Sequence, residues 1–489
     1  MAEENLVHHN LDFLKILGRY TLDSKMLVCQ KYSSRIMSRS MVDLNKACEE
    51  NIMPWEIEAF AAYSIVYDND CASEELDGKT FAETITLIRN YWHEGLTAAE
   101  ESGDYPEFFM MISALQQFPV QGVFIQKLYR YHYFFTFQNS NLDMRKVLFD
   151  KMGVAYEQLE ELAFLVFYGF SQEVQDKLEE STIQKILEKA FSDTDAVRLL
   201  SIEKDDYKKE LFSLYKDNII DQYYGLKIQY LYPFISGKDF TYIPSPYLVV
   251  NAVTESMLNR VTFRDNKLRR AIGKEVIESY LYNIVRQLDT VTWISPELLY
   301  KKGKDKLLTS DVIAAEGDNV IFYDTKAITP SLKLRKFDVA EIEADIEIYA
   351  EDVIQIYNQI NNYLQGCFQL DKQYLKDKIF GIVVVLEDAV VSRKKVYEKV
   401  YEILEKTGTL DTEEKNYICS HIKVLPLRAI ECMILQNTSL LPELIEQLSK
   451  PERWYDYTYT NATIENGKIP LYSKYEKDLK SRIKNRIMG

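Results

Sequence analysis

The spacing of apolar residues changes near residue 289, and this change constrains the fold most. In residues 1–240 apolar side chains recur three and four positions apart, for example in 155–169 and 183–191, as on one face of a helix. Beyond 289, short apolar and β-branched runs alternate with helical patterns. This order predicts an α+β protein, with an all-helical N-terminal module followed by a mixed β-sheet flanked by helices.

Glycine and proline mark the expected domain boundary. The chain has only 17 Gly and 12 Pro in 489 residues, which favours many helices and few tight turns. A local cluster nevertheless predicts an inter-domain linker, formed by Pro233, Gly237, Pro244 and Pro246. We therefore expect three parts: a helical regulatory or interaction module in 1–240, a sheet-containing domain in 241–450, and a C-terminal hairpin around Asn466-Gly467 with a basic helical tail in 451–489.

The second half has a definite predicted order of elements. A long helix over 249–288, with a break near 264–266, precedes three strands, the last two joined by a turn at Glu316-Gly317-Asp318. The strands are expected at 290–294, 307–315 and 319–326, followed by a helix at 341–365, a buried strand at 379–386, a helix at 392–407 and a strand at 421–427.

Charge is distributed unevenly along the chain. Of the net charge of −16, residues 1–240 carry −15 and residues 241–489 carry −1. The acidic first half disfavours contact with a phosphate backbone, so nucleic acid is expected to contact the second half. Its basic groups are Lys301, Lys302, Lys304 and Lys306, then Lys333, Arg335 and Lys336, then Arg393, Lys394 and Lys395.

Cysteine and histidine usage limits the chemistry. The six cysteines form no Cys-x-x-Cys pair, and the five histidines are scattered, so neither structural zinc nor a disulfide framework is expected. Reduced thiols favour a cytoplasmic protein. We also expect neither a membrane-spanning helix nor a secretion signal, since no window holds eighteen uncharged apolar residues. A metal site in this chain would be built from carboxylates.

The stretch TSDVIAAEGDNVIFYDTKA at 309–327 holds the most informative side chains. Asp324 and Lys326 are two apart on one predicted strand and therefore share a face. If the two strands pair through the 316–318 turn, Asp311 lies opposite Asp324. Two carboxylates repel each other unless a cation lies between them, and Mg²⁺ or Mn²⁺ prefers such oxygen ligands.

Two helices supply further candidates. Glu278 lies on the helix before the first strand and adds a third carboxylate. On the helix after the hairpin, Gln359 and Tyr363 are four apart and share one face, from which both can orient a water, a lysine or a phosphate.

This set of residues resembles the PD-(D/E)XK nuclease superfamily, with a Gln-x-x-x-Tyr element similar to that of its RecB-type branch. The resemblance covers about 250–430, with Ser310 standing where the family name has proline. It implies a restriction-endonuclease-like core in which Asp311 and Asp324 bind the metal, Glu278 is a direct or outer ligand, and Lys326 positions or activates the attacking water. Gln359 and Tyr363 would support the site.

The expected function is a Mg²⁺- or Mn²⁺-dependent nuclease acting on nucleic acid, with DNA favoured over RNA and a role in restriction or phage defence. Residues 1–240 would bind a protein partner or form a homo-oligomer. The alternative is a non-catalytic module that binds nucleic acid or protein through a nuclease-like core, with Asp324 and Lys326 as an ordinary ion pair. Another metal-dependent hydrolase is disfavoured because no histidine cluster supports it.

Overall fold

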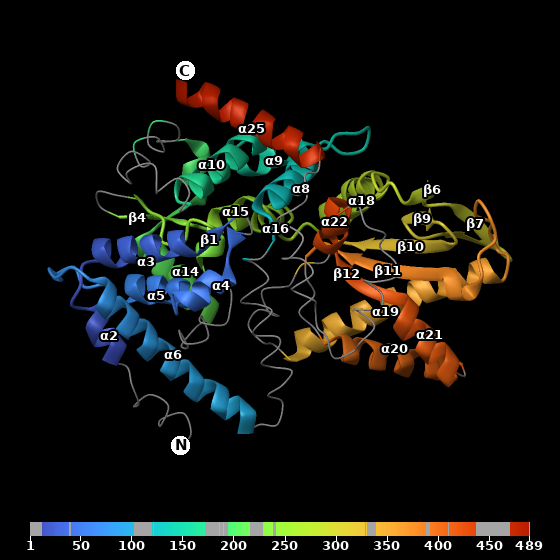
Figure 1. Cartoon of the computed structure of the whole chain (residues 1–489), viewed down its shortest axis with the longest axis horizontal. Coiled ribbons are helices and arrows are strands. Elements are labelled where there is room, and N and C mark those ends of the chain that lie inside the picture. The colour runs from blue at the N-terminus through green and yellow to red at the C-terminus, as the bar shows by residue number, and fades with distance from the viewer. Residues whose placement is uncertain are drawn as a thin grey trace. The chain divides into compact units, whose positions relative to one another are not determined.

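The computed structural model describes residues 12–38, 41–101, 120, 122–171, 185, 189, 194–215, 228–237, 241–327, 329, 339–387, 392–408, 410–436 and 470–488. The chain divides into two compact units (Figure 1). The first contains Met1–Thr136, Met144–Val261 and Lys474–Gly489, and the second contains Phe137–Asp143 and Thr262–Ser473. The boundary therefore falls after Val261 rather than after 240, and the C-terminal helix belongs to the first unit instead of forming a separate tail.

The described part of the first unit is mainly helical, and the predicted α+β class is confirmed. Its strands are short: β1 (Met37–Ser38) pairs with β2 (Met41–Val42), and β3 (Ser201–Glu203), β4 (Phe234–Ser236) and β5 (Thr241–Tyr242) form a second small sheet. Its helices are α2 (Asp12–Leu17), α3 (Leu22–Ile36), α4 (Leu44–Glu49), α5 (Pro54–Val66), α6 (Gly78–Glu101), α8 (Phe124–Thr136), α9 (Met144–Met152), α10 (Tyr156–Gly169), α13 (Asp195–Leu200), α14 (Lys204–Tyr215), α15 (Leu248–Val253), α16 (Glu255–Val261) and α25 (Pro470–Met488).

Two of the predictions fall wholly or mostly outside the described residues. The hairpin around Asn466-Gly467 lies there, as does most of the helix expected at 183–191. The helix expected at 155–169 is confirmed by α10. None of the helices that the structure describes is long and apolar enough to cross a bilayer.

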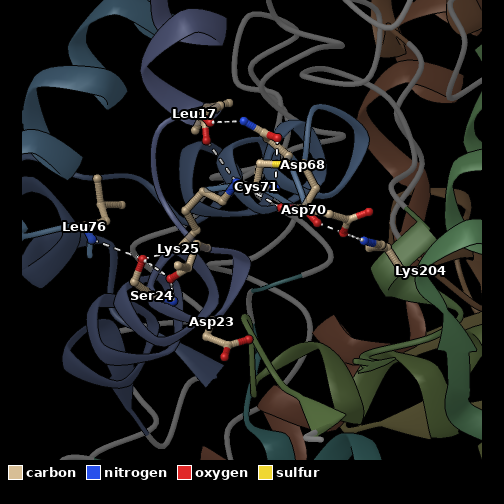
Figure 2. A network of polar contacts seen from close by, with 12 residues as sticks. Leu17, Asp23, Ser24, Lys25, Asp68, Asp70, Cys71, Leu76 and Lys204 are labelled. Carbon is tan, nitrogen blue, oxygen red and sulfur yellow. Dashed lines mark hydrogen bonds and ion pairs between the residues drawn. The ribbon is translucent and has the colours of Figure 1, made fainter. Parts of the chain in front are cut away.

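A buried lysine connects distant helices of the first unit (Figure 2). The Lys25 ammonium on α3 is fully buried, donates to the Leu17 carbonyl at 3.0 Å and lies 3.5 Å from Asp68 Oδ1. Lys204, at the start of α14, approaches both Asp68 and Asp70 at 2.9 Å. Burial lowers the pKa of Lys25, and Asp68 partly offsets this effect. The network fixes α2, α3 and α14 around the segment that follows α5.

A mixed five-stranded sheet organises the second unit, in the order β12-β11-β10-β9-β6. The pairs β6–β9 and β9–β10 are antiparallel, and the pairs β10–β11 and β11–β12 are parallel. Helices α18 and α22 pack on one side and α19 and α20 on the other (Figure 1). The bounds are β6 (Val291–Pro296), β9 (Val312–Glu316), β10 (Asn319–Lys326), β11 (Ile379–Val385), β12 (Ile422–Pro426), α18 (Glu278–Val285), α19 (Val339–Leu364), α20 (Arg393–Thr407), α21 (Thr412–His421) and α22 (Leu427–Gln436).

The predicted strand over 307–315 is wrong, because the chain forms two strands there. Strand β8 (Asp305–Leu308) pairs with β7 (Leu299–Lys302) in a separate hairpin, and β9 begins only at Val312. Thr309 causes the interruption: its N–H donates to the Leu298 carbonyl at 3.0 Å, and its hydroxyl accepts from the Leu298 N–H at 2.9 Å. These bonds close the base of the hairpin and release the chain into the sheet at Asp311.

The predicted 249–288 helix is also segmented more than expected. Helices α15 and α16 precede a break at Arg264, whose φ is +56°, and Asp265 then caps α17 (Asn266–Ala271) by accepting from the Leu268 N–H at 3.0 Å. A six-residue π-helix, η4 (Ile272–Ile277), continues directly into α18. π-Helical turns often lie at functional sites, where they redirect side chains.

Candidate functional site

Adjacent antiparallel strands bring the predicted acidic residues together. Tyr323 pairs with Val312, so Asp324 on β10 lies opposite Asp311, the residue before β9. Asp324 is only 3% exposed, and Lys326 Nζ lies 2.8 Å from its Oδ2. The prediction that Asp324 and Lys326 share a face is thus confirmed.

Asp311 is fixed by the backbone and side chain of Thr325. Its Oδ2 accepts from the Thr325 N–H at 2.6 Å and from the Thr325 hydroxyl at 2.7 Å. The carboxylate therefore supplies an acceptor for the Thr325 N–H beyond the last residue pair of β9 and β10. Because alternate side chains along β10 point to opposite faces, the Thr325 side chain leaves the strand on the face opposite to Asp324 and Lys326.

Helix α19 contributes two side chains that the sequence reasoning missed. Asp352 Oδ1 lies 3.0 Å from Lys326 Nζ, and Gln355 bridges the ion pair on β10. The Gln355 amide accepts from Lys326 at 3.1 Å and donates to Asp324 Oδ1 at 3.3 Å. Their signal was the helical spacing that places both on the same face as Gln359.

Gln359 and Tyr363 lie on successive turns of α19 and have different partners. Gln359 accepts a hydrogen bond from the buried Ser310 hydroxyl and so supports the residue before Asp311. Tyr363 lies outside the cluster, contrary to expectation. Its hydroxyl donates to the Lys372 carbonyl at 3.2 Å and accepts from the Tyr374 N–H at 2.9 Å. Eight residues separate Tyr363 from Gln355, which is about 12 Å along a helix.

The π-helix orients a second acidic and basic pair. Lys274 in η4 lies 3.3 Å from Glu278 at the start of α18 and 2.6 Å from Glu297, which follows β6. Glu297 and Lys274 were not among the predicted site residues. Lys274, Glu278 and Glu297 thus extend the cluster from the ends of β9 and β10 to α18.

The carboxyl groups disfavour one another's ionisation. Burial, and then the charge of Asp311, raise the pKa of Glu278 to about 8. Burial, and then the charge of Asp324, raise the pKa of Asp311 to about 6. Burial also raises the pKa of Asp324, although Lys326 opposes this shift. Ionising all three carboxyls is therefore costly, and a cation would lower that cost.

The donor set suits a hard divalent cation. In the described ranges, no three His, Cys, Asp or Glu side chains are grouped closely enough to hold a metal ion by themselves. Mg²⁺ commonly takes one or two carboxylates and completes its octahedron with water and phosphate oxygens. Asp311 and Asp324 are two carboxylates of this kind. Asp324 Oδ2 is buried and forms an ion pair with Lys326, but it accepts no hydrogen bond of regular geometry.

Comparisons with protein-family models, with curated proteins and with solved structures find no match. The residues of this cluster are therefore the basis for assigning a function to the chain.

Proposed function

We propose that this chain is a metal-dependent nuclease that hydrolyses phosphodiester bonds in nucleic acid. The observation that carries the proposal is the position of Asp311 and Asp324 at the ends of two adjacent strands, where Asp324 pairs with Lys326 and its charge raises the pKa of Asp311. Preference for DNA, and a role in restriction or phage defence, follow from the resemblance alone. The first unit would then bind a partner or regulate the second.

Lys326 supplies positive charge in this proposal. Burial disfavours its ammonium, but Asp324 and Asp352 outweigh that effect and raise its pKa. The lysine therefore stays protonated at neutral pH, and its role is to stabilise negative charge that develops on the phosphate. Gln355 holds the ammonium beside the strand end.

Asp311 and Asp324 would hold Mg²⁺ or Mn²⁺, with Glu278 next to Asp311. When bound, the cation would supply Lewis-acid stabilisation of the phosphate oxygens. The Thr325 N–H and hydroxyl keep Asp311 at the strand end, and Gln359 fixes the preceding residue through Ser310. The protein thus preorganises the donors before substrate arrives.

The direct test is cleavage of supercoiled plasmid, linear duplex, single-stranded DNA and RNA by the purified chain with Mg²⁺ or Mn²⁺, with and without a chelator. Asp324→Asn and Lys326→Met should abolish cleavage without unfolding the protein, and Lys326→Met should retain metal binding by calorimetry. Tyr363→Phe is the matched control and should cleave normally. A wild-type protein that binds nucleic acid but never cleaves it would support the non-catalytic alternative instead.

A further inference from the structure

A two-stranded hairpin projects from the chain between β6 and β9. Strands β7 and β8 pair in register from Leu299 opposite Leu308 to Lys302 opposite Asp305, with Gly303 at φ +62° in the turn. Glu297 precedes the hairpin, and Asp311 follows it. The Leu298–Thr309 hydrogen bonds close its base, so its direction is tied to the acidic cluster.

One face of the hairpin is fixed to the second unit. Tyr300 is buried, its ring lies 4.8 Å from that of Phe368, and its hydroxyl accepts from Asn362 at 2.8 Å. Lys302 Nζ donates to the side-chain amide oxygen, Oδ1, of Asn362 at 2.7 Å. These contacts to α19 and the residues after it explain how an isolated two-stranded hairpin keeps its position.

The opposite face has no such packing. Leu299 and Leu308 are 66% and 48% exposed and lie directly opposite each other. Lys301 and Lys306 form the next cross-strand pair, and Lys304 is in the turn. All three lysines are exposed, and none of them makes an ion pair with any residue that the structure describes.

This arrangement is unfavourable for the isolated protein. Like charges directly opposite each other on a sheet repel. The exposed leucines beside them also lose most of the free energy that burial of their side chains would contribute. The chain carries a net charge of −16, yet within the described residues no acidic side chain forms an ion pair with these three lysines, although Asp305 lies between two of them in sequence. An anionic ligand with apolar surface between its charges would relieve both costs.

We propose that this outward face binds the phosphate backbone of the nucleic-acid substrate, an inference that rests on the proposed nuclease function. Lys301, Lys304 and Lys306 would contact phosphates, and the two leucines would lie against the sugars between them. Lys306 and Asp311 are five residues apart, and that length of chain reaches at most roughly 16 Å. Because this limit corresponds to about five nucleotide steps along a duplex strand, Lys306 would contact the strand within about five nucleotides of the bond that is cut.

The test compares two triple variants of the full chain. The first is Lys301→Gln, Lys304→Gln and Lys306→Gln. The control is Lys394→Gln, Lys395→Gln and Lys406→Gln, which removes the same charge from the exposed surface of α20 and includes two of the three residues of the basic patch predicted at 393–395. Cleavage of a DNA duplex is measured against salt concentration, beside hydrolysis of bis(p-nitrophenyl) phosphate, which is too small to reach the hairpin.

The hairpin variant should raise KM for the duplex about tenfold or more and make the slope of log affinity against log salt shallower by about 2 to 3. Its kcat and its rate on the small diester should stay at the wild-type level, as should every parameter of the α20 control. Wild-type KM and salt slope in the hairpin variant would overturn the inference while leaving the nuclease proposal intact.

Failure of the proposed nuclease function can be distinguished from failure of the proposed binding surface. If the wild type cleaves no nucleic acid, fluorescence anisotropy with the same duplex decides the role of the hairpin alone. Weaker binding by the hairpin variant than by the control would support the surface, and equal affinities would overturn it.

Discussion

The contacts of Lys326 show which residue-level interactions can be predicted from sequence and which cannot. Its pairing with Asp324 follows from strand alternation alone, and the structure has that pair at 2.8 Å. Asp352 and Gln355 could not be assigned in the same way, because helical spacing defines a face but not which turn meets the sheet. The Gln-x-x-x-Tyr pattern therefore drew attention to Tyr363, although Gln355 makes the contact with the ammonium.

Gln355 gives a prediction at this scale. Gln355→Ala should lower cleavage about 10- to 100-fold, since outer residues that orient a site typically contribute that much. Gln359→Ala should have an effect in the same range, through Ser310. Steady-state cleavage rates beside calorimetric Mg²⁺ titration will measure both. Unchanged rates for Gln355→Ala would show that the bridge between Asp324 and Lys326 has no catalytic importance.

Lys423 gives a prediction about pH. It lies on β12, is 2% exposed and donates to the Cys419 carbonyl, and burial lowers its pKa from 10.5 to about 8. Between these values the unfolded chain binds more protons than the folded chain, so this residue makes stability rise with pH from about 8 to 10.5. Below that window the lysine is charged in both states and its burial cost is complete.

Lys423→Met should therefore stabilise the protein at pH 7 by roughly 2–3 kcal/mol, and the gain should shrink as pH approaches 10.5. Urea unfolding of both proteins across this range measures the difference. A constant difference at every pH would contradict the assigned titration.

At the scale of elements, the sheet was predictable and the hairpin beside it was not. Strands β10 and β11 match the expected ranges to within a residue, because a turn signal precedes one and the other is a continuous apolar run. The β8–β9 interruption depends on hydrogen bonds from Leu298 and Thr325, which lie far from it in sequence or across a strand. The pattern of apolar residues alone does not predict such hydrogen bonds.

Gly381 tests how α19 reaches the site. A Cβ at this β11 position would clash with Ile356 Cγ2, so Gly381→Ala should push α19 away and cost about 1–3 kcal/mol. Because Gln355 neighbours Ile356, cleavage should fall as well. The double variant Gly381→Ala with Ile356→Ala removes the clashing methyl and should recover part of the activity.

The control for Gly381→Ala is Gly408→Ala at the end of α20, where an added Cβ has no neighbouring atom within 4 Å. Thermal unfolding and cleavage rates of the four proteins form the measurement. Equal stability of Gly381→Ala and wild type would mean that α19 does not approach β11 as closely as described.

At the scale of the whole molecule, the C-terminal helix completes the first unit. Glu160 on α10 is fully buried, accepts from Tyr475 at 2.7 Å and from Arg482, and lies 2.9 Å from His132 Nδ1. Arg486 donates to the neighbouring Glu161 at 2.8 Å. The sequence showed α25 as a basic tail, but it could not show that two acidic residues more than 300 positions earlier are its partners.

Arg482→Ala should destabilise the first unit by about 3–5 kcal/mol, because it removes the charge partner of a buried carboxylate. Hydrogen exchange should locate the loss in α10 and α25. Lys484→Ala, an exposed position on the same helix, should change stability by less than about 0.5 kcal/mol. Similar exchange rates in both variants would argue against a stabilising role for the ion pair.

The discontinuity of the first unit has a consequence for synthesis on the ribosome. Residues 474–488 leave the ribosome after the whole second unit, although their partners on α10 were made more than 300 codons earlier. At about 5–20 residues per second, α10 waits at least about 15 seconds before Tyr475 and Arg482 are available to Glu160. A message truncated just before residue 474 would therefore yield a complete second unit joined to an unfinished first unit, so the first unit is the last part of the nascent chain to be completed.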